Sequence, residues 1–209
     1  MKSSFGHTLR LFRLVWTLSC HGALFPLDSF NLPRGLVGLL RLLERRSDTM
    51  RPGERLAAAL QSMGPTFIKL GQSLAVRGDL IGDDVADDLS ALQDNLPPFP
   101  SEDAIATVEQ ELGGSEGELF ASFDQEPVAA ASIAQVHFAK RHDGIAVAVK
   151  ILRPGIEDAF ARDVAFFLWL ARVVERFLPE ARRLKLVEVV GNFKEMVALE
   201  IDLRMEAAA

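Results

Sequence analysis

The spacing of apolar residues along the chain changes from a helical period to a strand-like pattern near residue 119. Between Arg51 and Leu80, apolar side chains recur every three or four residues, which predicts helices with one buried face. Gly64-Pro65 interrupts this periodicity, and proline is tolerated at the start of a helix but not in its interior. We therefore predict two consecutive helices in this region, joined at Gly64.

A third predicted helix follows Gly82 and ends before the prolines at 97, 98 and 100. Its inward face carries Val85, Leu89 and Leu92. Three aspartates are expected outside that face, namely Asp84, Asp87 and Asp88. The pattern predicts an amphipathic helix with an acidic outer surface.

A fourth predicted helix begins at Ser101, because serine favours helix starts, and closes at Gly113, because glycine favours helix ends. Its expected inward residues are Ile105, Val108 and Leu112.

The next part of the chain is enriched in apolar and β-branched residues and predicts strands at residues 119–123, 132–139 and 145–152. Asp143-Gly144 lies between the last two segments and is a strong signal for a hairpin turn. Two long helices are expected afterwards, at residues 156–177 and 186–206. A helical N-terminal extension followed by three or more antiparallel strands and long helices is an α+β fold.

Residues 1–48 are predicted to form an extension of short pieces that opens with an apolar and basic helix. Leu9, Phe12, Val15 and Trp16 lie roughly on one side of this helix, so either a membrane surface or the protein's own domain would cover them. The apolar run at residues 14–20 is shorter than the about 20 residues that span a bilayer. We expect no transmembrane helix in this chain.

The formal net charge of -6 argues against a broad nucleic-acid-binding surface, which needs clustered positive charge. The single cysteine, Cys20, has no second cysteine with which to form an internal disulfide. The four histidines, His7, His21, His137 and His142, show no metal-ligand spacing and are interpreted as surface or packing residues.

Candidate chemistry begins with the alanine-rich segment at residues 127–137 and the strand that carries Lys150. A turn of small residues between two strands lets main-chain N–H groups approach phosphates, and a lysine on the next strand neutralises phosphate charge. Alanines stand here where protein kinases use glycines. The arrangement predicts a nucleotide cradle, and the alternative is a strand lysine that only reaches solvent.

Three acids on the last predicted helix are candidate partners for this lysine: Glu200, Asp202 and Glu206. At about 100° per residue, Glu200 and Glu206 are about 120° apart around the helix axis, whereas Asp202 and Glu206 lie one turn apart. One lysine cannot pair with all three acids, so a second lysine is expected. Lys69 is the candidate, followed by Gly71, which would let another backbone approach. The alternative for the acids is a solvated helix face.

Four motifs together resemble the atypical kinase-like UbiB family of ubiquinone biosynthesis. They are the segment around Lys69-Leu-Gly-Gln72, the alanine-rich segment 127–137, the Val-Ala-Val-Lys150 strand and the segment Glu200-Ile-Asp202-Leu-Arg-Met-Glu206. Their order and spacing also agree with the family from about residue 50 to the end.

The resemblance implies roles for these residues. Lys69 and Gln72 are similar to the KxGQ signature, which lies on a helical extension over the active site. Glu200 and Asp202 resemble the ExD motif that engages the KxGQ lysine. Lys150 resembles the nucleotide-binding lysine. Glu206 looks like its partner from the following helix. The residues that resemble the alanine-rich nucleotide loop are Ala129, Ala130, Ala131 and Ser132.

The resemblance also implies a division into an irregular amphipathic extension at 1–48, a helical KxGQ extension at 49–118 and a kinase-like N-lobe at 119–209. The implied function is that of an atypical kinase or ATPase-like protein supporting ubiquinone (coenzyme Q) biosynthesis. The implied cofactor is ATP or ADP with Mg²⁺, whose ligands are not in this chain. The implied location is peripheral, on the cytoplasmic side of the inner membrane.

The chain stops at Ala209, before the catalytic-loop and metal-binding lobe that family members carry. We therefore expect the chain alone to turn over little or no ATP, and a fragment of a longer protein is one interpretation. A second is a non-catalytic module that stabilises membrane-associated ubiquinone-biosynthesis proteins. The family is sometimes labelled a hydroxylase, but this sequence contains no flavin-type glycine fingerprint to support that chemistry.

Overall fold

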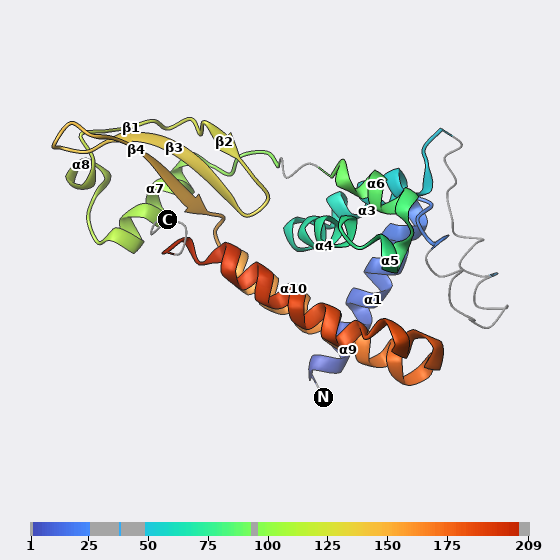
Figure 1. Cartoon of the computed structure of the whole chain (residues 1–209). Helices are drawn as coiled ribbons and strands as arrows, with labels where there is room; N and C mark the ends of the chain where they lie inside the picture. Colours follow the sequence, from blue (N-terminus) through green and yellow to red (C-terminus); the bar gives the residue numbers. More distant parts are fainter. Residues whose placement is uncertain (1, 26–37, 39–48, 93–95, 205–209) are drawn as a thin grey trace. The chain divides into compact units, whose positions relative to one another are not determined.

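The structure is a computed structural model that describes residues 2–25, 38, 49–92 and 96–204 (Figure 1). It divides into two compact units, each built from two stretches of chain. We call residues 1–93 with 160–198 the helical unit, and residues 94–159 with 199–209 the sheet unit. The division expected near residues 48 and 118 stays a prediction.

The helical unit contains α1 (Lys2–Cys20), α3 (Pro52–Met63), α4 (Pro65–Ala75), α5 (Gly78–Ile81), α6 (Asp83–Ser90), most of α9 (Ile156–Phe177), the 3₁₀ helix η2 (Pro179–Leu184) and most of α10 (Leu186–Ile201). Gly64 lies between α3 and α4 with φ of 103°. The predicted break at Gly64-Pro65 is therefore confirmed. The prediction of short pieces at residues 26–48 falls mostly outside the described residues.

Aromatic side chains on α9 form the centre of the helical unit. Phe166 is only 1% exposed, and its ring centroid lies 6.0 Å from that of Trp169 and 6.2 Å from that of His7 on α1. Phe167 meets Phe67 of α4 edge-on at 5.0 Å. Phe167 also lies 6.2 Å from Phe193 of α10, and the two long helices run side by side (Figure 1).

One carboxylate joins three of these helices. Asp163 of α9 accepts a hydrogen bond from Arg10 of α1 at 2.8 Å and another from Thr66 of α4 at 2.8 Å. A partly buried carboxylate with two donors satisfies polar groups that packing would otherwise leave unpaired. This contact fixes one side of α1 against its own unit, whereas Leu9, Phe12 and Trp16 on the predicted apolar side are exposed.

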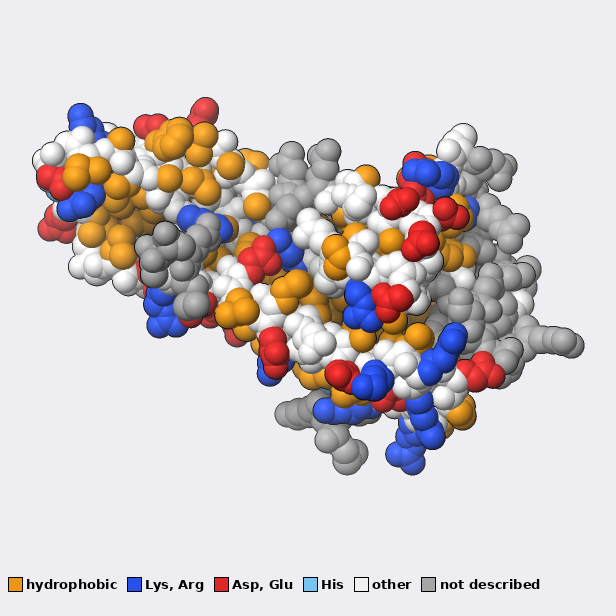
Figure 2. Space-filling model, in the orientation of Figure 1, with side chains coloured by type: hydrophobic (Ala, Val, Ile, Leu, Met, Phe, Trp, Pro, Cys, Tyr) orange, Lys and Arg blue, Asp and Glu red, His pale blue; other side chains and the backbone are white. Residues whose placement is uncertain are grey.

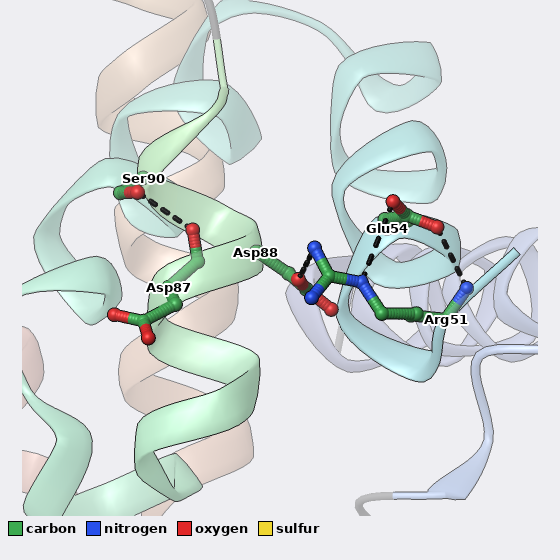
Figure 3. A network of polar contacts seen from close by, with 5 residues as sticks. All are labelled: Arg51, Glu54, Asp87, Asp88 and Ser90. Atoms are coloured by element: carbon green, nitrogen blue, oxygen red, sulfur yellow. Dashed lines mark hydrogen bonds and ion pairs between the residues drawn. The ribbon is translucent and has the colours of Figure 1, made fainter.

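The acidic helix α6 differs from its prediction on one side. Leu89 and Leu92 are buried as expected, but Asp88 is only 4% exposed and forms an ion pair with Arg51 (Figure 3). Arg51 also bonds through its main-chain N–H to Glu54 at 2.7 Å. Asp88 turns inward because Gly53 has no side chain. A Cβ added there would lie 2.4 Å from the Asp88 Cβ.

The sheet unit contains α7 (Ser101–Leu112), α8 (Glu116–Leu119) and the strands β1 (Ser122–Phe123), β2 (Ala129–Ala130), β3 (Ala134–Lys140) and β4 (Ala146–Leu152). All strand pairs are antiparallel. β4 pairs with β3 along its whole length, so β1 and β2 share the other edge of β3. The predicted α+β class is confirmed.

The hairpin between β3 and β4 forms as the Asp143-Gly144 dipeptide predicts. Gly144 has φ of 87°, a conformation in which L side chains are strained. The Arg141 N–H donates to the Ile145 carbonyl at 2.9 Å, which closes the turn. The register that follows pairs His137 with Val149 and Val136 with Lys150.

Alternation along the strands separates a buried face from an exposed face. Ala139 and Ile151 contribute to a core cluster with Ala104 and Val108 of α7, and Phe120 and Phe123 complete it. Successive strand residues point to opposite faces of a sheet. Side chains at even positions of β3 and β4 therefore lie on the face away from α7.

Three local predictions in this unit were wrong. Leu119 belongs to α8 rather than to a strand, because the Ser115 N–H and hydroxyl bond to Glu118 at 2.8 and 2.7 Å and begin a helical turn. These hydrogen bonds lower the pKa of Glu118. Leu112 is 58% exposed, since the cluster has no member on α7 beyond Val108.

The third error concerns the end of α10, which stops at Ile201 rather than near residue 206. Asp202 accepts hydrogen bonds from the Arg204 backbone at 3.2 Å and from its side chain at 2.8 and 2.9 Å. Aspartate side chains that bond to nearby N–H groups compete with helix continuation. The predicted helix is therefore interrupted at Asp202, and the expected spacing of Asp202 and Glu206 falls outside the described residues.

Candidate functional site

The exposed face of the β3–β4 ribbon places Lys150 among small and apolar side chains. Lys150 lies directly opposite Val136, and Ala148 lies directly opposite Phe138. Phe138 is 53% exposed, although it belongs to the centre of the ribbon. Hydrophobic side chains gather on the surface of the strands in Figure 2. The face combines exposed apolar side chains with two ammonium groups, Lys150 beside Val136 and Lys140 at the hairpin end.

The alanine-rich segment borders this face. Ala129 pairs with Val136 and therefore lies on the same face as Lys150. The turn itself is shorter than expected, because Ala129 and Ala130 belong to β2 and only residues 131–133 connect it to β3. The Ala131 N–H donates to the Ala134 carbonyl at 2.8 Å, and Ser132 is fully buried.

The KxGQ residues lie on α4 in the helical unit. Lys69 is 6% exposed, and the Gln72 amide nitrogen donates to the Leu92 carbonyl at 3.4 Å. Gly71 admits side chains rather than another backbone, which corrects the expectation. A Cβ added there would lie 2.5 Å from the Leu92 Cδ1 and 2.8 Å from the Leu60 Cδ1.

The acids of the ExD segment have different surroundings. Glu200 is half-buried in the last turn of α10. Asp202 pairs with Arg204, and hydrogen bonding from that side chain lowers the pKa of Asp202. Glu206 lies outside the described residues. Lys69 belongs to one unit and Glu200 to the other, so an ion pair between them stays a prediction.

The described part of the chain contains no group of three or more His, Cys, Asp or Glu side chains arranged to hold a metal ion. His137 is fully buried, and both of its ring nitrogens make hydrogen bonds. None of the described helices is both long enough and apolar enough to cross a membrane.

Residues 91–209 match the family described as the ABC1 atypical kinase-like domain, which covers both the β3–β4 ribbon and the ExD segment. The chain is thus an atypical kinase-like protein. It is 44% identical over 200 residues to a probable protein kinase UbiB of Pseudomonas aeruginosa strain LESB58, covering 96% of this chain and 35% of that protein. The chain belongs to the UbiB family.

A second relative in the genus Pseudomonas gives the same assignment. A probable protein kinase UbiB of Pseudomonas putida strain GB-1 is 46% identical over 168 residues, covering 80% of this chain and 31% of that protein. The chain thus spans about a third of the length of these relatives. A solved complex of Rv3197 with erythromycin from Mycobacterium tuberculosis is 32% identical, with a TM-score of 0.45, and covers 71% of this chain and 38% of that one.

Proposed function

We propose that the chain is the N-terminal part of an atypical kinase or ATPase-like protein that supports ubiquinone biosynthesis, and that it binds adenine nucleotide on the exposed face of the β3–β4 ribbon. The register that sets Lys150 opposite Val136 is the observation that carries this proposal. Val136, Phe138 and Ala148 would contact the flat base, while the Lys150 ammonium group would meet the phosphates.

The alanine-rich segment would border the phosphates from the other side. Ala129, Ala130, Ala131 and Ser132 are the residues assigned to that role. Alanine side chains fill space that glycine would leave open, so the approach of phosphates to the main chain is more restricted than in a glycine-rich loop. We therefore expect this site to hold the phosphates differently from the glycine-rich loop of protein kinases.

The remaining motif residues would complete the site. We propose that Glu206 pairs with Lys150, and that Lys69 pairs with the acids Glu200 and Asp202 while Gln72 supports them. The bidentate contact between Arg204 and Asp202 competes for that carboxylate, so Glu200 is the preferred partner for Lys69. That the ligands of Mg²⁺ lie outside this chain stays an expectation, and we assign no step to the metal.

Lys150→Ala is expected to weaken binding of ATP and ADP by about 10- to 100-fold, because a hydrogen bond to a charged group is worth about 1.5–3 kcal/mol. The measurement is isothermal titration of the 209-residue chain with each nucleotide in the presence of Mg²⁺. Lys140→Ala is the matched control. Lys140 lies opposite Ala146, on the same face but at the hairpin end of the ribbon.

Equal affinity of the Lys150→Ala and Lys140→Ala variants would contradict the assignment of the phosphate-binding lysine. If the unaltered chain, Lys69→Ala and Lys150→Ala all fail to bind nucleotide, the second candidate function is favoured, namely a module that assembles or stabilises ubiquinone-biosynthesis proteins at the membrane.

The surface of α1 supports that second candidate. Leu9, Phe12 and Trp16 are 63%, 67% and 51% exposed, and the rings of Phe12 and Trp16 stack at 6.4 Å. Arg13 is exposed beside them, and residues 2–20 contain no acid. An apolar stripe with basic neighbours suits the interface of an anionic bilayer, and we propose that α1 attaches the chain peripherally to the cytoplasmic side of the inner membrane.

Replacing Phe12 and Trp16 together by serine is expected to lower co-sedimentation with vesicles containing anionic lipid by about tenfold or more, since each buried aromatic side chain contributes about 1.5–3 kcal/mol. Phe177→Ser is the control, because Phe177 is 71% exposed at the end of α9. Unchanged co-sedimentation of the double variant would show that the stripe does not hold the chain on the membrane.

A further inference from the structure

Arg153 directly follows β4 and lies beside the alanine-rich turn. Its main-chain N–H donates to the Ile133 carbonyl at 2.8 Å, which continues the strand ladder to the base of the turn. The residue is half-buried, so its side chain lies over the sheet unit rather than extending into water. This placement puts a guanidinium group within reach of the turn carbonyls.

The guanidinium group bonds to two segments that are distant in sequence. Nε and one terminal nitrogen donate to the Ala131 carbonyl at 3.2 and 3.0 Å. The same terminal nitrogen donates to the Pro97 carbonyl at 2.7 Å. The guanidinium carbon also lies 5.5 Å from the centre of the Phe99 ring, a cation–π distance. Arg153 therefore connects the turn to the segment at residues 97–99.

The segment at residues 97–99 is held independently from the other side. The Phe99 N–H donates to the Gln135 side-chain oxygen at 3.0 Å, and Gln135 is fully buried in β3. The anchor for Arg153 is thus attached to the sheet and not to a loose loop. A fixed anchor allows one side chain to determine the conformation of the turn at Ala131.

We propose that Arg153 is a positioning residue for the alanine-rich turn: it holds the Ala131 carbonyl and thereby sets the turn that borders the nucleotide site. The inference rests on the proposed nucleotide binding and goes beyond it, because Arg153 acts through the turn and does not contact the nucleotide itself. Lysine is not equivalent at this position, since a point charge cannot reproduce the flat, forked donor set or the ring contact.

The test combines amide hydrogen exchange of residues 127–137 with titration of ATP into the 209-residue chain. Arg153→Gln is expected to speed exchange in the turn and to weaken ATP binding, each by about tenfold, because the Ala131 carbonyl loses both charged donors. Arg153→Lys is expected to give an exchange rate in the turn and an ATP affinity similar to those of Arg153→Gln. Arg141→Gln, in the exposed β3–β4 turn, is the control that should change neither quantity.

Val108→Ala tests whether a loss of stability alone could weaken ATP binding. This variant opens the core cluster of the same unit without changing the turn. If Val108→Ala weakens ATP binding as much as Arg153→Gln does, or if exchange in the turn is unchanged in Arg153→Gln, the positioning role is overturned. If the unaltered chain binds no nucleotide, the proposed function fails, and the exchange rates still decide the role of Arg153.

Discussion

Replacing Phe166 by alanine is expected to lower the free energy of unfolding by about 4 kcal/mol, within the about 3–5 kcal/mol typical of phenylalanine truncation in a core. Phe166 is 1% exposed and lies against His7 and Trp169, so neighbouring rings cannot easily close the space. Urea unfolding followed by circular dichroism measures the change. An unchanged slope with a lower midpoint would show that the stability changed while the surface exposed on unfolding did not.

Phe177→Ala is the matched control for this prediction. It removes the same side chain from the same helix, but Phe177 is 71% exposed. The expected change is within about 0.5 kcal/mol, as for most surface substitutions. Equal losses for the two variants would contradict the assignment of Phe166 to the centre of the helical unit.

Gly53→Ala is expected to lower the free energy of unfolding by about 3 kcal/mol, at the upper end of overpacking costs. The new Cβ would lie 2.4 Å from the Asp88 Cβ, an atom too close to the backbone to move alone. α3 and α6 must therefore separate. The separation would also weaken the contact between Arg51 and Asp88. Calorimetric melting of the Gly53→Ala variant and the parent chain measures the loss.

The control is Gly191→Ala in the interior of α10, where an added Cβ would meet nothing within 4 Å. The same substitution is expected there to raise stability by about 0.5–1 kcal/mol, since alanine has the better helix propensity. A destabilisation by Gly191→Ala similar to that of Gly53→Ala would show that close packing is not the cause. A stable Gly53→Ala variant would contradict the observed approach of α3 and α6.

Local patterns in the sequence were sufficient where structure depends on neighbouring residues. The hairpin at Asp143-Gly144, the helix end at Gly113 and the bounds of the helix at 156–177 were all predicted. Each depends on a turn residue or on helical periodicity, which a single sequence contains.

Features that depend on long-range packing were missed. The burial of Asp88 follows from a glycine 35 positions earlier in the chain, and no periodic pattern reports such a pairing. Arg153 was overlooked for the same reason, because its partners at Pro97 and Ala131 are 56 and 22 positions away. The motif residues were candidates from local patterns and took their roles from the resemblance, and the structure adds which face Lys150 occupies.

The buried hydrogen-bond chain through β3 has a consequence for the histidine in the alanine-rich motif. The Gln135 oxygen accepts from the Phe99 N–H, so its amide nitrogen must donate to His137 Nε2, at 2.8 Å. The proton of the neutral ring is then on Nδ1 and points to the Asp124 carbonyl, at 2.8 Å. Both ring nitrogens of this imidazole are therefore committed to hydrogen bonds inside the sheet unit, and neither is left to bind a ligand or transfer a proton.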